Sequence, residues 1–222
     1  MAEQQSGFTI GAIIFAWAEL LRRHARLAGL AFGALAAAGT LVDVTLGDRG
    51  GQIVGSIATF FVQYLVAEHV LRAEGMFDQS LRGRRYASVF GASILTTLGG
   101  LAGMILLVLP GFYVLARWSL TVPIIIAEGK TATDAIGESW RRTETSVWPI
   151  FAIYLVCLLG VLAMAAAIGG LTAVATGSAD GLPVLLLTNS FSAAVSIFGS
   201  ILTIALYALL GHSQAQYDDI FA

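Results

Sequence analysis

The order of apolar and charged residues predicts a series of long apolar helices separated by short charged loops. Uncharged stretches occupy most of the sequence, and the charged residues gather at their ends. A helix needs about 20 predominantly apolar residues to cross a hydrocarbon core of about 30 Å. Divided at its charged and turn-forming residues, the sequence predicts six transmembrane helices, over residues 27–46, 50–72, 86–108, 111–128, 146–176 and 182–211.

The boundary between the third and fourth of these helices is a turn signal and not a charge. Residues 86–116 contain no charged side chain, and as one helix they would be roughly 46 Å long. Pro110 and Gly111 stand side by side within this stretch, a combination typical of turns. We therefore expect a helical hairpin here. Pro123 should also kink the fourth helix or free a backbone carbonyl, because proline has no backbone N–H to donate.

Two shorter segments, residues 7–24 and 131–143, are amphipathic. Each has apolar side chains and a tryptophan, Trp17 or Trp140, on one helical face and charged side chains on the other. Such helices lie along a membrane interface, with tryptophan at the depth of the headgroups and arginine toward water. The two segments either contact anionic lipid or a partner, or form an interfacial collar that closes the helix bundle.

The composition agrees with a membrane protein and excludes most other classes. The chain is 57% hydrophobic and only 12% charged, and its mean hydropathy is +0.83, whereas soluble domains have about 25% charged residues. Disordered chains, disulfide scaffolds and nucleic-acid-binding modules are excluded, because they need more charge or more cysteine. Cys157, the one cysteine, is expected to be a small buried apolar residue. We predict an all-α polytopic membrane protein with six transmembrane helices and two cytoplasmic interfacial helices, in a single integral membrane domain over residues 1–222.

The basic residues predict the orientation of the chain. Placing the N-terminus inside puts ten of the 12 lysines and arginines on the cytoplasmic side, namely Arg22, Arg23, Arg26, Arg72, Arg82, Arg84, Arg85, Lys130, Arg141 and Arg142. Arg49 lies on the other side and Arg117 within a span. Since cytoplasmic loops are enriched in basic residues, both termini should be cytoplasmic in a bacterial inner membrane.

Arg117 is the most informative charged residue. Counted from a turn at the outer surface, it lies roughly 10 Å inside the membrane, where an arginine is costly and normally faces a partner. Asp43 lies at a compatible depth. An ion pair between Arg117 and Asp43, or snorkelling of Arg117 outward, is one interpretation. The other is a site for an anion or a phospholipid headgroup.

Two further polar features are candidates for function. Glu128, at the cytoplasmic end of the fourth span, could cap the next helix, pair with basic residues or relay protons. The last span has a stripe of polar residues at every third or fourth position: Asn189, Ser192, Ser196, Ser200, Thr203 and Tyr207. Small polar residues at this spacing favour close helix packing, while the alternative is the lining of a solute path.

No catalytic motif is found in the sequence. The histidines, His24, His69 and His212, lie far apart and lack the spacing of metal ligands. We therefore expect no catalytic, metal-binding or cofactor-binding residues, no cofactor and no enzymatic activity. The expected partners are membrane lipids and, in addition, a membrane protein or a second copy of the chain, but no nucleic acid.

Several residues resemble the pattern of a known membrane family. The sequence has Leu109-Pro110-Gly111-Phe112-Tyr113, then Arg117-Trp118, Pro123 and Glu128, then Ala135 and Ser139-Trp140-Arg141. This pattern resembles the membrane-domain family named after glycerophosphoryl diester phosphodiesterase and related bacterial six-helix families. In the proteins that give the family its name, the module is attached to a soluble phosphodiesterase domain, which this chain has no room for. The resemblance implies a stand-alone membrane module.

Two functions remain open at this point. The leading hypothesis is a non-catalytic inner-membrane module that scaffolds or regulates a membrane partner or organises lipid. The alternative is a transporter or carrier of a lipid or small anion that uses Arg117 and the polar stripe.

Overall fold

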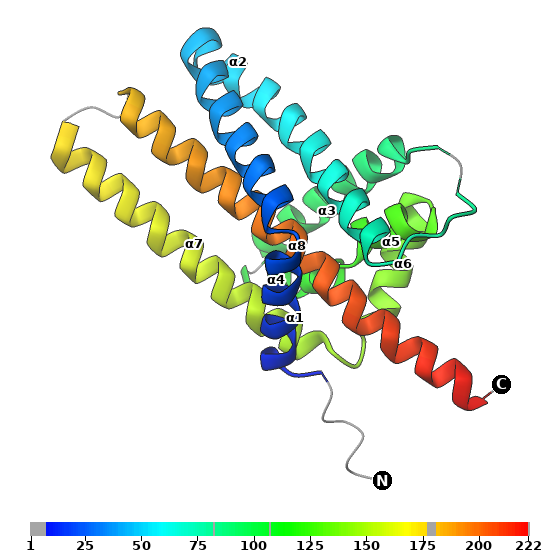
Figure 1. Cartoon of the computed structure of the whole chain (residues 1–222). Coiled ribbons are helices and arrows are strands. Elements are labelled where there is room, and N and C mark those ends of the chain that lie inside the picture. Colours follow the sequence, from blue (N-terminus) through cyan, green and yellow to red (C-terminus); the bar gives the residue numbers. More distant parts are fainter. Residues whose placement is uncertain (1–7, 82, 107, 177–180, 222) are drawn as a thin grey trace. The chain divides into compact units, whose positions relative to one another are not determined.

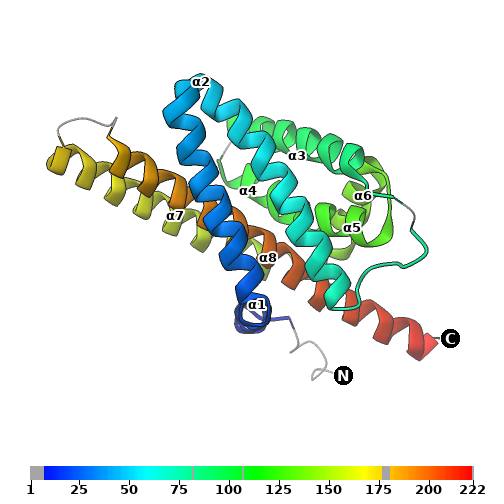
Figure 2. The ribbon, with the colours of Figure 1, turned by 45° about the horizontal axis from the view of Figure 1, so that its top comes forward.

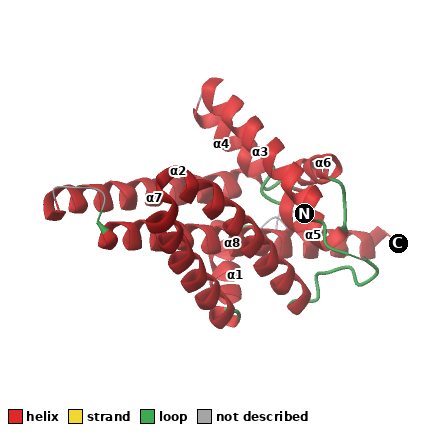
Figure 3. Cartoon of the chain, turned by 90° about the horizontal axis from the view of Figure 1, so that it is seen from above, coloured by secondary structure: helices red, strands yellow, loops and turns green. Residues whose placement is uncertain are grey.

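The chain is helical wherever the structure describes it. The structure, a computed structural model, describes residues 8–81, 83–106, 108–176 and 181–221. In these ranges it contains helices and loops and no strand (Figure 3). The predicted fold class, an all-α polytopic membrane protein, is confirmed. The helices are α1 (Ile10–Arg23), α2 (Ala25–Ala73), α3 (Tyr86–Leu106), α4 (Val108–Arg117), α5 (Thr121–Glu128), α6 (Ala132–Arg142), α7 (Val147–Thr176) and α8 (Leu182–Phe221).

Several helical segments, one of which covers both α4 and α5, are long and apolar enough to cross a membrane. Within the described residues they are Ala25–Gly47, Gly50–Ala73, Pro110–Glu128, Val147–Leu171 and Leu182–Gly211. The span predicted over residues 86–108 contains a shorter apolar helix, Tyr86–Leu101. Helices α1 and α6 lie within the two segments expected to be amphipathic, although residue 7 falls outside the described residues. The six crossings and the interfacial position of α1 and α6 stay predictions.

The chain divides into two compact units. The first unit consists of Met1–Leu20, Ala67–Val156 and Ile201–Ala222, and the second of Leu21–Val66 and Cys157–Ser200. Helices α2, α7 and α8 each contribute to both units. Each unit is described by itself below.

The second unit is built from two helical hairpins. Helix α2 reverses direction at Gly47, whose φ of 67° is a conformation that residues with a side chain rarely adopt (Figures 1 and 2). The parts of α7 and α8 in this unit run antiparallel to each other (Figures 1 and 2). The hairpins are joined by polar contacts: Asn189 Nδ2 donates to Asp43 Oδ2 at 2.8 Å, and Gln63 Nε2 to the Ser196 carbonyl at 3.5 Å.

The first unit is packed around α5. This helix contacts α3 and α6, and α3 also packs against α4. Because α5 is apolar on every side, nearly all of it is buried, from Thr121 to Ala127. Gly129 ends α5 in the left-handed conformation, φ 69°, and its N–H donates to the Ile125 carbonyl. This turn directs the chain into α6, whose N-cap Thr131 accepts a hydrogen bond from the Asp134 N–H.

The helix predicted over residues 111–128 is interrupted. Helix α4 ends at Arg117 and α5 begins at Thr121, and the residues between them form a turn, which we call the α4–α5 break. Pro123 supplies a physical reason, because its ring cannot donate to the carbonyl of residue 119 and would collide with it in a regular helix. From this proline the sequence predicted a kink or a freed backbone carbonyl, but not that the helix would be divided into α4 and α5.

Candidate functional site

The α4–α5 break is closed by hydroxyl groups from α6. Ser139 Oγ donates to the Arg117 carbonyl at 2.7 Å and accepts from the Leu120 N–H at 3.1 Å. Thr143 Oγ1, at the end of α6, lies 3.2 Å from the same Arg117 carbonyl. Ser139 and Thr143 are fully buried. Two of the backbone groups at the interruption, the Arg117 carbonyl and the Leu120 N–H, are thereby bound, and α6 is the element that holds the break in place.

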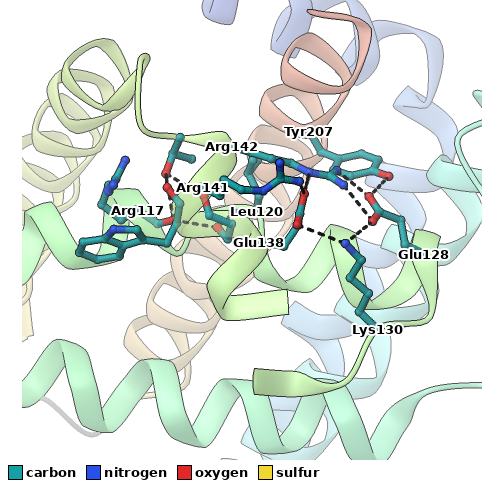
Figure 4. Close-up of polar contacts among 11 residues, drawn as sticks. Arg117, Leu120, Glu128, Lys130, Glu138, Arg141, Arg142 and Tyr207 are labelled. Carbon is teal, nitrogen blue, oxygen red and sulfur yellow. Dashed lines mark hydrogen bonds and ion pairs between the residues drawn. The ribbon is translucent and has the colours of Figure 1, made fainter. Parts of the chain in front are cut away.

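The side chain of Arg117 lies at this break without a polar partner. Only 5% of the residue is exposed, and its Nε and Nη1 atoms have no hydrogen-bond partner among the described residues. Its guanidinium carbon lies 4.4 Å from the ring centroid of Trp140 and 6.0 Å from that of Tyr113. Figure 4 shows the guanidinium over the indole ring and apart from the ionic network of α5 and α6. Among the described residues of the first unit, this guanidinium therefore contacts aromatic faces.

The aromatic contact offsets only part of the cost of burying Arg117. A desolvated cation over a tryptophan face gains about 2 kcal/mol. Removing a guanidinium from water costs several kcal/mol, and more when its N–H groups are left unbound. Two buried hydroxyl oxygens of the same segment, Ser119 Oγ and Thr121 Oγ1, also have no partner among the described residues. In the described part of the chain, the break therefore holds buried polar side-chain atoms from three residues that have no hydrogen-bond partner.

The opposite end of α5 carries an ionic cluster in which the charges are paired. Arg142 Nη1 and Nη2 donate to Glu128 at 2.6 and 3.0 Å, and Arg142 Nε donates to Glu138 at 2.6 Å. Tyr207 of α8 donates its hydroxyl to Glu128 Oε1 at 2.9 Å. Lys130 lies 3.3 Å from Glu128 and 3.4 Å from Glu138 (Figure 4). This cluster ties α5, α6 and α8 together within the first unit.

The pKa values in α6 reflect this pairing. Burial alone would raise the pKa of Glu138, but hydrogen bonds from Arg141 and Arg142 and the charges of Arg142 and Lys130 lower it to about 2. Burial alone would lower the pKa of Arg142, but the hydrogen bonds and charges of Glu128 and Glu138 raise it. Both α6 groups stay charged at neutral pH, so the cluster is a permanent electrostatic link.

In the second unit, Asp43 is bound by Asn189. Their contact, at 2.8 Å, joins two residues that the sequence singled out separately. The helices approach closely here: a Cβ added to Gly39 would lie 2.5 Å from Asn189 Oδ1, and one added to Gly51 would collide with Asp43 Oδ1. Asp43 and Arg117 belong to different units, and each has other neighbours within its own unit. Their ion pair stays a prediction.

The remaining candidates are placed as follows. Glu128 pairs with basic residues, and Thr131 is the residue that caps α6. In the polar stripe, Asn189 and Tyr207 each donate to a carboxylate of another helix. Ser196 accepts through its backbone carbonyl and Ser192 is exposed, while Ser200 and Thr203 have other interactions. These contacts favour helix packing as the role of both ends of the stripe.

Sequence reasoning missed the role of the α6 residues that organise the site. Ser139 and Thr143 are four residues apart, as are Glu138 and Arg142, so each pair lies on one helical face. The sequence indicated an amphipathic helix here but not that its hydroxyl groups bind a helix break. Among the described residues, no group of three or more His, Cys, Asp or Glu side chains is placed to hold a metal ion.

The comparisons with known proteins identify one family. Residues 90–216, more than half of the chain, match the membrane domain of glycerophosphoryl diester phosphodiesterase. The matched region contains helices α4 to α7 entire, and therefore the α4–α5 break and the ionic cluster. No curated protein and no solved structure matches the chain significantly.

Proposed function

Because the chain belongs to the membrane-domain family of glycerophosphoryl diester phosphodiesterase, we propose that it is a non-catalytic module of the bacterial inner membrane. In this proposal it scaffolds or regulates a membrane partner, or organises lipid around itself, and both of its termini are cytoplasmic. The family is defined by a membrane domain and not by the catalytic domain of the phosphodiesterase, which is compatible with a role other than catalysis.

The observation that carries the proposal is the use of polar side chains to hold helices together. The Ser139 hydroxyl is hydrogen-bonded to the backbone at the α4–α5 break. Glu128 and Tyr207 bind each other in the cluster that links α5, α6 and α8. Asp43 and Asn189 do the same between the hairpins of the second unit. A solute path needs polar groups that are open to the solute, whereas a scaffold needs helices fixed in one arrangement.

Native mass spectrometry of the gently extracted protein tests the proposal. The protein is taken from the membrane in a lipid-preserving polymer and exchanged into a neutral detergent before the measurement. We expect the protein to retain a second polypeptide or a fixed number of phospholipids through the exchange. Recovery of the bare monomer under every extraction condition would contradict the proposal, because a scaffold must hold what it organises.

A second candidate function, a carrier of a lipid or small anion, is favoured by one observation. Arg117 is buried and keeps unbound N–H groups, as a transient anion site would require. Reconstituted vesicles loaded with a small anion distinguish this candidate. If the protein is a carrier, the wild type releases the anion from the vesicles faster than Arg117→Gln does. If it is a scaffold, vesicles with either protein release the anion as slowly as vesicles without protein.

A further inference from the structure

We propose that Arg117 is the cationic centre of a phosphate-binding site at the α4–α5 break. The ligand is a phosphate group, either the phosphodiester of a phospholipid headgroup or a free phosphate ion. The inference rests on the proposed function and deepens it, because it names the chemistry of the lipid that the module would hold. The inference of a phosphate site also holds if the module has a protein partner in addition to lipid.

The first argument is the unmet binding capacity of Arg117. Among the described residues, it is the one basic side chain with buried nitrogen atoms that have no hydrogen-bond partner. Native proteins leave few buried polar groups unsatisfied, and an unpaired one points to an ion or water that completes the site. A guanidinium offers five N–H donors in a planar arrangement that matches the oxygen atoms of a phosphate.

The second argument is that the acidic side chains of the neighbouring helices are engaged elsewhere. Glu138 is bound by Arg141 and Arg142, and Glu128 by Arg142 and Tyr207. Asp134 of α6 accepts a hydrogen bond from the Thr131 hydroxyl at 2.6 Å. The carboxylates of α5 and α6 that are paired in this way do not serve Arg117. A bound anion can supply the counter-charge that these three carboxylates do not.

The third argument is the presence of two further donors in the same segment. The hydroxyl oxygens of Ser119 and Thr121 are buried and have no partner among the described residues. Hydroxyl groups donate to phosphate oxygens and commonly accompany arginine in phosphate sites. The backbone N–H groups of Leu120 and Thr121 already bind Ser139 Oγ and the Trp118 carbonyl. The buried side-chain polar atoms of this segment that are still without a partner, among the described residues, belong to residues 117, 119 and 121.

The fourth argument favours a lipid as the source of the phosphate. Trp140, which stacks on Arg117, belongs to a chain of aromatic rings that continues through Tyr113 and Trp148 to Phe151. Trp148 is 70% exposed and Trp140 is 39% exposed. Exposed tryptophan and tyrosine rings collect at the depth of lipid headgroups. A phosphate beside Arg117 would have its glycerol and acyl groups next to such rings.

The test measures phosphate binding by the full chain after its lipids are removed in a neutral detergent. Two probes are titrated separately, a short-chain phosphatidylglycerol and inorganic phosphate, and the shift in thermal unfolding temperature is followed for each. Arg117→Gln removes the charge at the break. Arg141→Gln is the matched control, because it removes the same charge from α6 at a side chain that is 67% exposed.

We expect phosphatidylglycerol to stabilise the wild type and Arg141→Gln equally and to bind Arg117→Gln at least about tenfold more weakly, the loss that follows from one charge-assisted hydrogen bond. If inorganic phosphate also stabilises the wild type in an Arg117-dependent manner, the source includes the free ion. The proposal of a phosphate site is overturned if both probes bind Arg117→Gln as tightly as they bind the wild type. It is also overturned if the probes bind neither protein.

A second variant covers the case in which Arg117→Gln does not fold. Arg117→Lys keeps the positive charge but loses the planar donor arrangement, so it should bind phosphatidylglycerol several-fold more weakly than the wild type. Unchanged affinity in this variant overturns the site. The outcome is separable from that of the proposed function, because a protein without an Arg117-dependent phosphate site could still retain a second polypeptide in native mass spectrometry.

Discussion

Arg117 lies just before the first residue of the buried helix α5, and Arg142 of α6 binds Glu128 at the last residue of α5. The surroundings of the two arginines differ. Arg142 is bound by two carboxylates within the chain, whereas the guanidinium of Arg117 contacts aromatic rings and has two nitrogen atoms without a hydrogen-bond partner among the described residues. Both arginines are largely withdrawn from solvent, so burial does not separate them. The difference teaches that burial alone does not decide how a charge is used in the first unit: Arg142 holds helices together, whereas Arg117 is the basis of the proposed phosphate site.

Removal of Arg142 should have the largest effect on stability. Arg142→Ala leaves Glu128 and Glu138 partly buried without their main partner, and we expect the free energy of unfolding to fall by about 3 kcal/mol. The measurement is chemical unfolding in detergent micelles. Arg141→Ala, at an exposed side chain of the same helix, should change it by less than about 0.5 kcal/mol. Equal losses in the two variants would show that Arg142 is an ordinary surface charge.

Removal of the Ser139 hydroxyl tests the contact that closes the α4–α5 break. Ser139→Ala leaves the Leu120 N–H without its acceptor and weakens the binding of the Arg117 carbonyl, so we expect a loss of about 2 kcal/mol. Ser93→Ala is the matched control, since that hydroxyl donates only to a carbonyl of its own helix, and it should cost less than about 0.5 kcal/mol. If the control is the more damaging of the two, the break does not depend on α6.

Removal of the Tyr207 hydroxyl should lower the free energy of unfolding less than removal of the Ser139 hydroxyl. Tyr207→Phe deletes one hydrogen bond to Glu128, which keeps its contacts with Arg142 and Lys130, so we expect a loss of about 1 kcal/mol. Tyr113→Phe is the control, because the known contacts of Tyr113 are made by its ring. Unfolding of both variants under the same conditions gives the comparison. A Tyr207 variant as stable as the control would mean that α8 is not tied to the ionic cluster.

A change of pH near neutrality should affect the stability less than any of these substitutions. The pKa of Glu138 is lowered from an ordinary value of 4.5 to about 2 in the folded chain. Its contribution to stability is therefore constant above about 4.5 and is lost as the pH falls toward 2. We expect the difference in stability between the wild type and Glu138→Gln to be flat from about pH 5 to 8 and to shrink below about pH 4. A difference that changes near neutrality would contradict the assignment.

The sequence predicted the polar residues that matter more reliably than it predicted their partners. Arg117, Asp43 and Glu128 stand out because a charge within an apolar stretch is costly. The partner of Asp43 is Asn189, 146 residues further along the chain, and such a pairing depends on how the hairpins align. Periodicity within one helix carries no information on this alignment.

The α4–α5 break shows the same limit. Pro123 predicts a disturbance one turn before itself. Whether the helix bends or stops depends on what can bind the released backbone groups, and here Ser139 does so from a separate helix. The unpartnered nitrogen atoms of Arg117 could also not be predicted, because the partners of Glu128 and Glu138 depend on how α5, α6 and α8 pack. The sequence showed that a charged residue stands within an apolar stretch, but not that two of its nitrogen atoms lack a hydrogen-bond partner among the described residues.

An experimental density map of the protein in lipid nanodiscs, inspected at Arg117, tests the comparison of the two arginines most directly. The account predicts a phosphate group within hydrogen-bonding distance of the Arg117 guanidinium, beside the ring of Trp140, and Arg142 bound only to Glu128 and Glu138. A guanidinium of Arg117 paired with a carboxylate of the chain, such as that of Asp43, would contradict it.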